Sequence, residues 1–461
     1  MDKRTMMENL AREAYEKGGF NGVWLYAENG EIVSKGAFGW VDAENTLPMQ
    51  EDTIFEMASV TKQFTAAAIM LLVREGKLSV DDEYTKFFPE YPFKGVTVRH
   101  LLTHTSGLPK GLETDDLVVP VWENEHRIPP CSEMLRFLVE YGKEAGSAPG
   151  ERFEYNDINY CLLANLVEKL SGEKFEDFLK KNIFEPAGMD DTAILHTRRD
   201  GRPSERIARN MVMEDGVLVP SDLSRAAGYV VGSDGLNGCD YAYTTVFDML
   251  KWDRALRAGK VVTPEEQRIM YTTVRLNNGE DYFDEDGDGY GFGWCVRQDE
   301  EHGFVVCHSG GMPGLNTWFE RYLDEDRVLL IFINRDAEDY RTLSGLWDGM
   351  MAVARGEEPE PIVTLEDIMV KDPDKSGWES FCGQYEHPED DEFIVDEVWM
   401  KDGELWARAI DEDDNKLEFR LYPIGENKFG RKGGMLVLTF GDGCVTYLEK
   451  TWKKQIGRAH V

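Results

Sequence analysis

The sequence predicts an α/β domain over residues 1–355, followed by a small all-β barrel domain over residues 375–455. Strand patterns lie at both ends of the first region and helical patterns lie between them. This order favours one sheet built from both ends and covered by a helical insert. The acidic, proline-containing stretch 356–374 is typical of a linker. Short alternating runs separated by turns follow it and are typical of a barrel or sandwich. We expect residues 456–461 to be an unstructured tail.

The beginning of the α/β domain is expected to contain a helix, a hairpin and a second, buried helix. Residues 1–20 have an amphipathic helical pattern. A hairpin is expected over 22–42, because Asn29-Gly30 is a strong turn signal between two β-rich runs. Residues 61–75 carry a mostly apolar helical pattern that stops at Gly76. Because most faces of this helix are apolar, it should be buried together with the side chains at its start.

The rest of the chain is expected to return from helices to strands. Between residues 97 and 270 helical patterns alternate with long loops, and the clearest helices lie at 164–170 and 246–256. Strand patterns follow at 290–297, 303–308, 316–322 and 328–334, and a last helix is expected over about 340–355. Strands of the barrel are expected at 392–399, 404–410, 416–422, 435–440 and 445–450.

Composition excludes several classes of partner. The formal net charge is −36, which argues against nucleic acid or anionic membrane as a partner and would attract cationic ligands. The N-terminus lacks the apolar region of a signal peptide, and no run of about 18 apolar residues predicts a membrane span. The seven cysteines are scattered and form no CxxC pair, which indicates reduced thiols. We therefore expect a cytoplasmic location.

The first chemical motif is Ser59-Val-Thr-Lys62 at the start of the predicted buried helix. At this spacing the hydroxyl and the amine lie on one helix face, about one turn apart. The helix N-terminus favours an alkoxide, and burial can lower the pKa of a lysine enough to make it a base. The motif alone is weak, because Ser-x-x-Lys arises by chance in long chains. An N-cap serine followed by an ordinary helix lysine is the alternative.

Two further motifs strengthen the first. Residues 149–160, PGERFEYNDINY, contain Tyr155 and Asp157, and residues 307–311, CHSGG, end a predicted strand. Ser-x-x-Lys, then a tyrosine motif, then a basic residue-x-Gly on a strand is the order of the penicillin-recognising serine enzymes. With these motifs the chain resembles the family of class C β-lactamases, D-Ala-D-Ala carboxypeptidases, D-aminopeptidases and related esterases. The resemblance covers about residues 20–355 and extends to VTVRHLLTHTSGLP (96–109), YGFGW (290–294), HSGGMPGLNTWFERY (308–322) and FINRD (332–336).

The resemblance implies a class C β-lactamase-like domain, in which helices flank an antiparallel sheet and form a helical subdomain. It implies that Ser59 attacks the carbonyl carbon and that Lys62 and Tyr155 together take and return the proton. The N–H groups of Ser59 and Gly311 would form the oxyanion hole.

The strand motif and Asp157 would serve the substrate. His308 would stand where the lactamases carry lysine. The resemblance implies that the substrate lies along the strand edge at Ser309 and Gly310, with Gly310 leaving room for it. Asp157 would also face the substrate.

Two residues depart from the family pattern. His308 is largely neutral at pH 7, so it is a weaker anchor than lysine for the carboxylate of a penicillin or peptide. Asp157 occupies the place of the family asparagine, and an ionised carboxylate can only accept hydrogen bonds. Near Lys62 it would raise the pKa of that lysine and move the base role to Tyr155. Facing the cleft it would receive a cationic amine, and a third interpretation is reduced catalytic power.

Other motifs have simpler interpretations. Asp284, Asp286 and Asp288 resemble the start of an EF-hand loop, but position twelve is Cys295, so an acidic surface loop is favoured. His302, Cys307 and His308 lack metal-site spacing, and no metal or other cofactor is expected. The family resemblance implies that the segment His104-Thr-Ser106-Gly is structural rather than catalytic.

The predicted function is a serine hydrolase that forms an acyl-enzyme with small amides or esters. D-amino-acid peptides or amides are the favoured class. A broad esterase of the same fold, or a catalytically weak protein of the penicillin-binding type, remain as alternatives. The C-terminal domain resembles the lipocalin-like barrels of some relatives, which implies a role in substrate selection or in a homo-oligomer.

Overall fold

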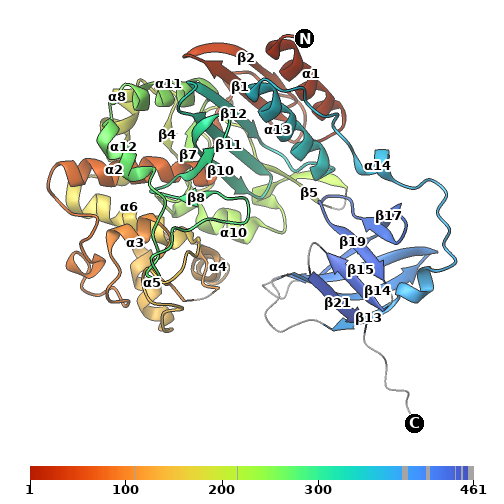
Figure 1. The fold of residues 1–461 in the computed structure, drawn as a ribbon. Coiled ribbons are helices and arrows are strands. Elements are labelled where there is room, and N and C mark those ends of the chain that lie inside the picture. Colours follow the sequence, from red (N-terminus) through yellow and green to blue (C-terminus); the bar gives the residue numbers. More distant parts are fainter. Residues whose placement is uncertain are drawn as a thin grey trace. The chain divides into compact units, whose positions relative to one another are not determined.

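The computed structural model describes all residues except 110, 215, 387–392, 412–415, 442, 448–449 and 455–461. The chain forms two compact units, each with its own sheet and hydrophobic core (Figure 1). The first unit comprises Met1–Asn9, Asn21–Asp336 and Met351–Glu357. The second comprises Leu10–Phe20, Ala337–Met350 and Glu358–Val461, so the helices α1 and α13 contribute to both. The domain boundaries expected at 355, 374 and 455 stay predictions.

The first unit contains a seven-stranded antiparallel sheet in the order β2-β1-β12-β11-β10-β9-β8 (Figure 1). Its strands are β1 Gly22–Glu28, β2 Glu31–Phe38, β8 Gly289–Tyr290, β9 Cys295–Asp299, β10 Gly303–Met312, β11 Leu315–Tyr322 and β12 Arg327–Ile333. Strands from both ends of the α/β domain thus form one sheet, as the sequence predicts. The β1–β2 hairpin turns at Asn29 and Gly30, both with positive φ, as a type I′ turn requires.

Besides the large sheet, this part of the chain contains helices and two small sheets, in the orders β3-β7-β4 and β5-β6. The helices are α1 Lys3–Glu16, α2 Lys62–Arg74, α3 Val98–Leu102, α4 Thr114–Glu125, α5 Met134–Tyr141, α6 Asp157–Ser171, α7 Phe175–Leu179, α8 Glu185–Ala187, α9 Thr197–Asp200, α10 Ala227–Gly232, α11 Val246–Arg257, α12 Pro264–Met270 and α13 Tyr340–Arg355. The short strands are β3 Phe55–Glu56, β4 Ala193–Ile194, β5 Met211–Glu214, β6 Val217–Pro220 and β7 Ala242–Thr244. Helix α6 begins at Asp157, seven residues before the helix expected at 164–170. The sequence prediction misses its first turn, because polar residues there interrupt the apolar pattern.

Helix α2 is the central buried helix of the first unit. A 3₁₀ turn, η1 (Ala58–Thr61), leads into it and packs on β10 and β11. After Lys62, its buried polar side chains both have partners: Gln63 Oε1 accepts from the indole N–H of Trp252 over 2.7 Å, and Thr65 donates to the carbonyl of Gly238 over 2.7 Å. These hydrogen bonds offset the cost of burying the polar groups in the first part of the helix. The prediction that this helix is buried is confirmed.

The second unit contains a nine-stranded, nearly closed all-β barrel in the order β16-β15-β14-β13-β21-β20-β19-β18-β17. The strands are β13 Gly383–Glu386, β14 Phe393–Lys401, β15 Glu404–Asp411, β16 Lys416–Arg420, β17 Tyr422–Gly425, β18 Lys428–Gly430, β19 Val437–Gly441, β20 Cys444–Tyr447 and β21 Lys450–Lys454, and the short helix α14 (Leu365–Ile368) precedes them. The strand expected at 445–450 matches β20 and reaches only the first residue of β21, and the sequence prediction misses β13, β17 and β18. These strands have three to five residues, too few for a clear alternation. The predicted tail at 456–461 lies outside the described residues.

Among the described residues, no helix is long and apolar enough to cross a membrane.

Candidate active site

Ser59 and Lys62 meet at the start of helix α2. Ser59 belongs to η1 and Lys62 is the first residue of α2, so one tight turn separates them. The Nζ of Lys62 donates to Ser59 Oγ over 2.8 Å. Lys62 is fully buried, whereas Ser59 is half-buried. The partly exposed Ser59 therefore contacts an amine, Lys62 Nζ, that solvent does not reach.

The backbone that presents Ser59 is strained and anchored. Ala58 has a φ of 43°, in the left-handed region that costs energy for a residue with a Cβ. Met57 is held on both sides: its N–H donates to the carbonyl of Ala242 over 2.8 Å, and its carbonyl accepts from Thr317 Oγ1 over 2.9 Å. Such strain persists only where the surroundings impose it, and it is common at active sites.

Lys62 lies among groups that favour its ammonium form. Besides Ser59, its Nζ donates to the carbonyl of Cys239 over 3.3 Å and forms an ion pair with Asp157, whose Oδ1 lies 2.5 Å away. The carboxylate balances the charge of the buried ammonium. Burial alone would lower the pKa of Lys62, but the carboxylate of Asp157, followed by Tyr155 and Asp240, raises it well above the usual value. The lysine of lowered pKa that the motif alone suggests is therefore not what the structure contains.

Tyr155 completes the hydrogen-bonded group around Ser59. Lys62 Nζ lies 4.9 Å from the centre of its ring, and 37% of the residue is exposed. Burial of the phenol raises the pKa of Tyr155 above its ordinary value. The charge of Lys62 and hydrogen bonds with Lys62 and Ser59 lower it, but burial is the larger effect. The residue is thus a neutral phenol that contacts both the nucleophile and the ammonium.

His104 and Ser106 support Tyr155 rather than the reaction. The imidazole of His104 stacks on Tyr155 with ring centres 4.2 Å apart, and its Nδ1 accepts from the backbone N–H of Asn156 over 3.1 Å. Ser106 donates to Asn159 Oδ1 over 2.7 Å, away from Ser59. These contacts favour the structural role that the sequence comparison implies for this segment.

His308 is neutral and has no N–H left for a substrate. Its Nδ1 lies 2.6 Å from the carbonyl of Ser309, which can only accept, so Nδ1 carries the proton. Its Nε2, 3.0 Å from the Tyr290 hydroxyl, therefore accepts. Burial, and then the charge of Lys62, lower the pKa of His308 to about 4. A buried, neutral imidazole with both nitrogens occupied cannot anchor a substrate carboxylate.

The outer half of β10 offers an open edge beside Ser59. Strand β9 pairs with β10 only as far as Cys307, whereas β11 pairs with it as far as Met312. Within the described residues, no strand covers the β9-side edge of 308–312. Ser309 and Gly311 are exposed on this half. An extended substrate could add to such an edge through backbone hydrogen bonds.

The interpretation that Gly310 leaves room for substrate is wrong. Gly310 is buried, and a Cβ there would lie 2.2 Å from the carbonyl oxygen of Met57 and 2.4 Å from Thr317 Oγ1. The glycine is needed so that β10 can approach the backbone before Ser59. At Gly311 a Cβ would meet nothing within 4 Å, so the open position is Gly311.

Asp157 and Asp240 form an acidic pair beside Lys62. Asp157 begins α6 and its side chain is 19% exposed, while Asp240 is 5% exposed in the loop before β7. A carboxylate oxygen of each and the Sγ of Cys239 all lie within 4.8 Å of one another. The contact of Asp157 with Lys62 agrees with the interpretation in which Asp157 raises the pKa of that lysine. Sequence analysis misses Asp240, because a single aspartate in a loop has no distinguishing pattern.

Cys239 makes this cluster a poor metal site. A hydrogen bond from Cys161 lowers the pKa of Cys239, but burial and the two carboxylates raise it to about 12. A metal ligand must be a thiolate, and this cysteine remains a thiol at neutral pH. The carboxylate of Asp157 also already forms an ion pair with Lys62, which a metal ion would have to displace.

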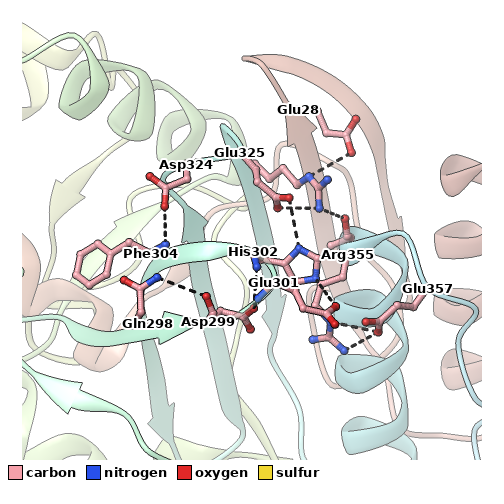
Figure 2. A network of polar contacts seen from close by, with 12 residues as sticks. Glu28, Gln298, Asp299, Glu301, His302, Phe304, Asp324, Glu325, Arg355 and Glu357 are labelled. Atoms are coloured by element: carbon pink, nitrogen blue, oxygen red, sulfur yellow. Dashed lines mark hydrogen bonds and ion pairs between the residues drawn. The ribbon is translucent and has the colours of Figure 1, made fainter.

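A second polar cluster lies away from Ser59, at the turn between β9 and β10 (Figure 2). Glu301, His302 and Glu357 offer ligand atoms within 4.8 Å of one another. Glu325 lies 3.3 Å from His302 Nδ1, and Arg355 donates to Glu357 over 2.9 Å. Because most of these charges already have partners, the cluster is a salt-bridge network that joins the turn to the end of α13.

The acidic loop at 284–288 contains turn contacts rather than an ion site. Asp284 Oδ1 accepts from the backbone N–H groups of Asp286 and Asp288, over 3.0 and 2.8 Å. Asp288 pairs with Arg297 over 3.2 Å. These contacts favour the acidic surface loop over the EF-hand interpretation.

Comparison with known proteins agrees with this geometry. A family model described as Beta-lactamase matches residues 7–346. Penicillin-binding protein 4* of Bacillus subtilis (strain 168) is 33% identical over 340 residues, 73% of each chain. The octameric penicillin-binding protein homologue from Pyrococcus abyssi has a TM-score of 0.66 at 24% identity and covers 98% of both chains. D-amino acid amidase from Ochrobactrum anthropi SV3, in complex with L-phenylalanine amide, has a TM-score of 0.63 at 23% identity over 77% of this chain and 99% of its own.

Proposed function

Since this chain belongs to the beta-lactamase family, whose members are serine hydrolases, we propose that it hydrolyses small amides or esters through an acyl-enzyme at Ser59. D-amino-acid peptides or amides are the favoured substrate class. The observation that carries the proposal is the 2.8 Å contact between Lys62 Nζ and Ser59 Oγ, beside an open strand edge. This contact and this edge support the proposal that a nucleophile, a proton relay and a surface for substrate lie together here.

The proton of Ser59 needs an acceptor, because Lys62 is already an ammonium. Lys62 first passes a proton to Asp157, 2.5 Å away, and the resulting amine then takes the proton of Ser59 as its oxygen attacks the carbonyl carbon. Tyr155 then protonates the leaving amine or alcohol and takes a proton from Lys62. Asp157 returns its proton to Lys62, so the net transfer is from Ser59 to the leaving group. Water repeats the sequence in the second half of the cycle.

The negative oxygen of the tetrahedral intermediate would lie between the N–H groups of Ser59 and Gly311. Gly311 is exposed and has open space at its Cβ position, and Ser59 is held by the strained turn at Ala58. Donors fixed before reaction stabilise the charge without reorganisation.

The state of His308 supports substrates without a carboxylate anchor. Neither nitrogen of His308 can donate to an anion, which makes β-lactamase and carboxypeptidase activity weaker proposals than amidase, aminopeptidase or esterase activity. The D-amino acid amidase from Ochrobactrum anthropi shares the fold of this chain and motivates the D-amino-acid class. A broad esterase is the alternative within the same chemistry.

A catalytically weak binding protein is the second candidate. The observation that favours it is the ion pair of Lys62 with Asp157, since an ammonium must lose a proton before it can accept one from Ser59, whereas a free amine accepts it directly. Hydrolysis assays separate the candidates: D- and L-aminoacyl p-nitroanilides are compared with short p-nitrophenyl esters, using wild-type protein and Ser59→Ala. The amidase proposal predicts turnover of the D-anilides that Ser59→Ala abolishes. Turnover of esters alone would favour the esterase, and no turnover would favour the binding protein.

Two further expectations remain proposals. Assembly of copies is supported by the octameric homologue from Pyrococcus abyssi, and light scattering of the full chain tests it. That the C-terminal domain forms the contacts between copies stays a prediction from the sequence. The cytoplasmic location expected from the sequence also stays a prediction.

A further inference from the structure

Three arginines gather around a small polar cavity in the first unit, apart from Ser59. The cavity has a volume of about 180 Å³ and is lined by Arg198, Arg202, Arg209 and several polar residues, among them Asn210, Ser221 and Tyr243. The lining includes none of the candidate catalytic residues. Three guanidinium groups around one cavity repel one another unless negative charge lies between them, so the charges around the cavity need to be counted.

Arg198 is the buried member of the three. Its side chain is 9% exposed, and it pairs with Glu56 over 2.8 Å and donates to the Tyr243 hydroxyl over 3.1 Å. A second acid, Asp234, lies 3.5 Å away. Burial raises the pKa of Asp234 to about 7, although the charge of Arg198 opposes the shift. Asp234 is therefore protonated for part of the time at neutral pH and supplies only part of a negative charge.

Arg202 and Arg209 have guanidinium N–H groups that no described residue accepts. Arg209 donates through Nη2 alone, to Asp222 over 3.2 Å. Arg202 donates through Nη1 to the carbonyl of Ile207 over 3.3 Å, and no acidic side chain in the described part of the chain forms an ion pair with it. A guanidinium has five N–H donors, so most of the donors on these two residues are left for a ligand or water. Arg202 is the positive charge in excess.

Ser221 adds a buried hydroxyl without a partner. The residue lines the cavity and is 1% exposed. Its backbone is anchored, because its N–H donates to the carbonyl of Asn210 over 2.9 Å and its carbonyl accepts from Ser224 Oγ over 2.7 Å. Its hydroxyl makes no hydrogen bond to a described residue. A hydroxyl so little exposed usually has a partner, and a group bound in the cavity would supply one.

The cavity lies on the pair of strands that leads to Ser59. Tyr243 of β7 pairs in register with Glu56 of β3. The residue after Glu56, Met57, donates through its N–H to the carbonyl of Ala242 on β7. The cavity is therefore separate from the nucleophile but rests on the strands that support it.

The size of the cavity and its donors favour a small oxyanion. A water molecule takes up about 30 Å³ of liquid, so 180 Å³ holds about six atoms or groups of that size. A phosphate ion has five non-hydrogen atoms. Guanidinium groups bind phosphate through paired N–H donors, and its four oxygens can accept from several groups at once. A carboxylate has two oxygens in one plane and would satisfy fewer of these donors.

We propose that Arg198, Arg202 and Arg209 form a binding site for phosphate, either as the free ion or as the phosphate group of a small ester. The hydroxyl of Ser221 donates to the bound anion, and Asp222 remains paired with Arg209. The inference goes beyond the hydrolase function proposed above and does not depend on it, because binding is measured without turnover.

Calorimetry of the full chain tests the site, with sodium chloride keeping the ionic strength constant. Inorganic phosphate and methyl phosphate are titrated into wild-type protein, Arg202→Gln and Ser221→Ala. We expect saturable binding to one site, weakened about tenfold by each replacement, because hydrogen bonds to a charged group are strong. Arg275→Gln is the matched control, since Arg275 is an exposed arginine that pairs with Asp281 outside the cavity. It should bind phosphate as wild type does.

The two anions distinguish the source of the phosphate group. Methyl phosphate that binds at least as tightly as inorganic phosphate supports the site and identifies an ester as its ligand. Binding of inorganic phosphate alone supports the site and identifies the free ion. No saturable binding to wild type, equal affinity in wild type and Arg202→Gln, or tighter binding of acetate than of phosphate would overturn the inference. Arg202 is exposed, so its replacement should preserve the fold, which melting curves check.

Discussion

The replacement Asp157→Asn tests the charge state of Lys62 without any substrate. In the wild-type protein Asp157 raises the pKa of the fully buried Lys62. That contribution to stability is therefore fully present below the unfolded lysine pKa of about 10.4 and is lost only as pH rises through the folded value. Without Asp157, burial lowers the pKa of Lys62, and the sign of the pH dependence reverses.

The magnitude has a ceiling set by deprotonation. A lysine that must be neutral in the folded protein loses about 1.4 kcal/mol for each pH unit below about 10.4, which amounts to about 4–5 kcal/mol at pH 7 and about 1 kcal/mol at pH 9.5. Asp240 remains near Lys62 and shares the charge, so we expect the single variant to lose about 2–4 kcal/mol at pH 7. The double variant Asp157→Asn, Asp240→Asn should approach the ceiling.

Equilibrium unfolding in urea at pH 7, 8.5 and 9.5 measures this effect. We expect the difference in unfolding free energy between wild type and Asp157→Asn to shrink as pH rises, because the stability of the variant increases. Asp281→Asn, an exposed residue, should show no such trend. Parallel stability curves for wild type and Asp157→Asn would refute the argument that Asp157 maintains the ammonium.

Two other predictions concern the rest of the site. His308 has a pKa lowered to about 4, so wild-type stability should fall by about 3 kcal/mol between pH 6.5 and 4 on its account, and His308→Gln should flatten that part of a urea-unfolding pH series. Gly310→Ala should lower stability by about 2–4 kcal/mol and slow the reaction of Ser59, because its Cβ would meet the Met57 carbonyl. Gly311→Ala, with open space, should melt normally, and equal melting temperatures for the two alanine variants would contradict this account.

Sequence patterns predict the elements whose contacts lie close together in the chain, such as a hairpin or a single helix. The Asn29-Gly30 turn determines the β1–β2 hairpin, and the apolar run after Lys62 makes α2 a buried helix. The spacing of Ser59 and Lys62 places both groups on one turn wherever that helix lies. The short strands of the barrel, such as β17 and β18, have too few residues to show a period and depend on their neighbours.

The chemistry of the site depends on contacts that no local pattern contains. The ammonium state of Lys62 arises from Asp157 and the Cys239 carbonyl, which are far away in the sequence. The neutral state of His308 arises from its burial and from the charge of Lys62. Asp240 affects the pKa of Lys62 only because the fold brings the two residues close together. The family resemblance identifies the motifs, whereas the protonation states of Lys62 and His308 follow from contacts seen only in the structure.

Labelling with a fluorophosphonate tests the central claim most directly, because it requires no choice of substrate. Intact mass and peptide mapping compare wild-type protein with Ser59→Ala, both shown to be folded. An activated nucleophile predicts one adduct per chain on the peptide that contains Ser59, and no adduct in the variant. A wild-type protein that stays unlabelled, or the same adduct in both proteins, would contradict the assignment of Ser59 as the nucleophile.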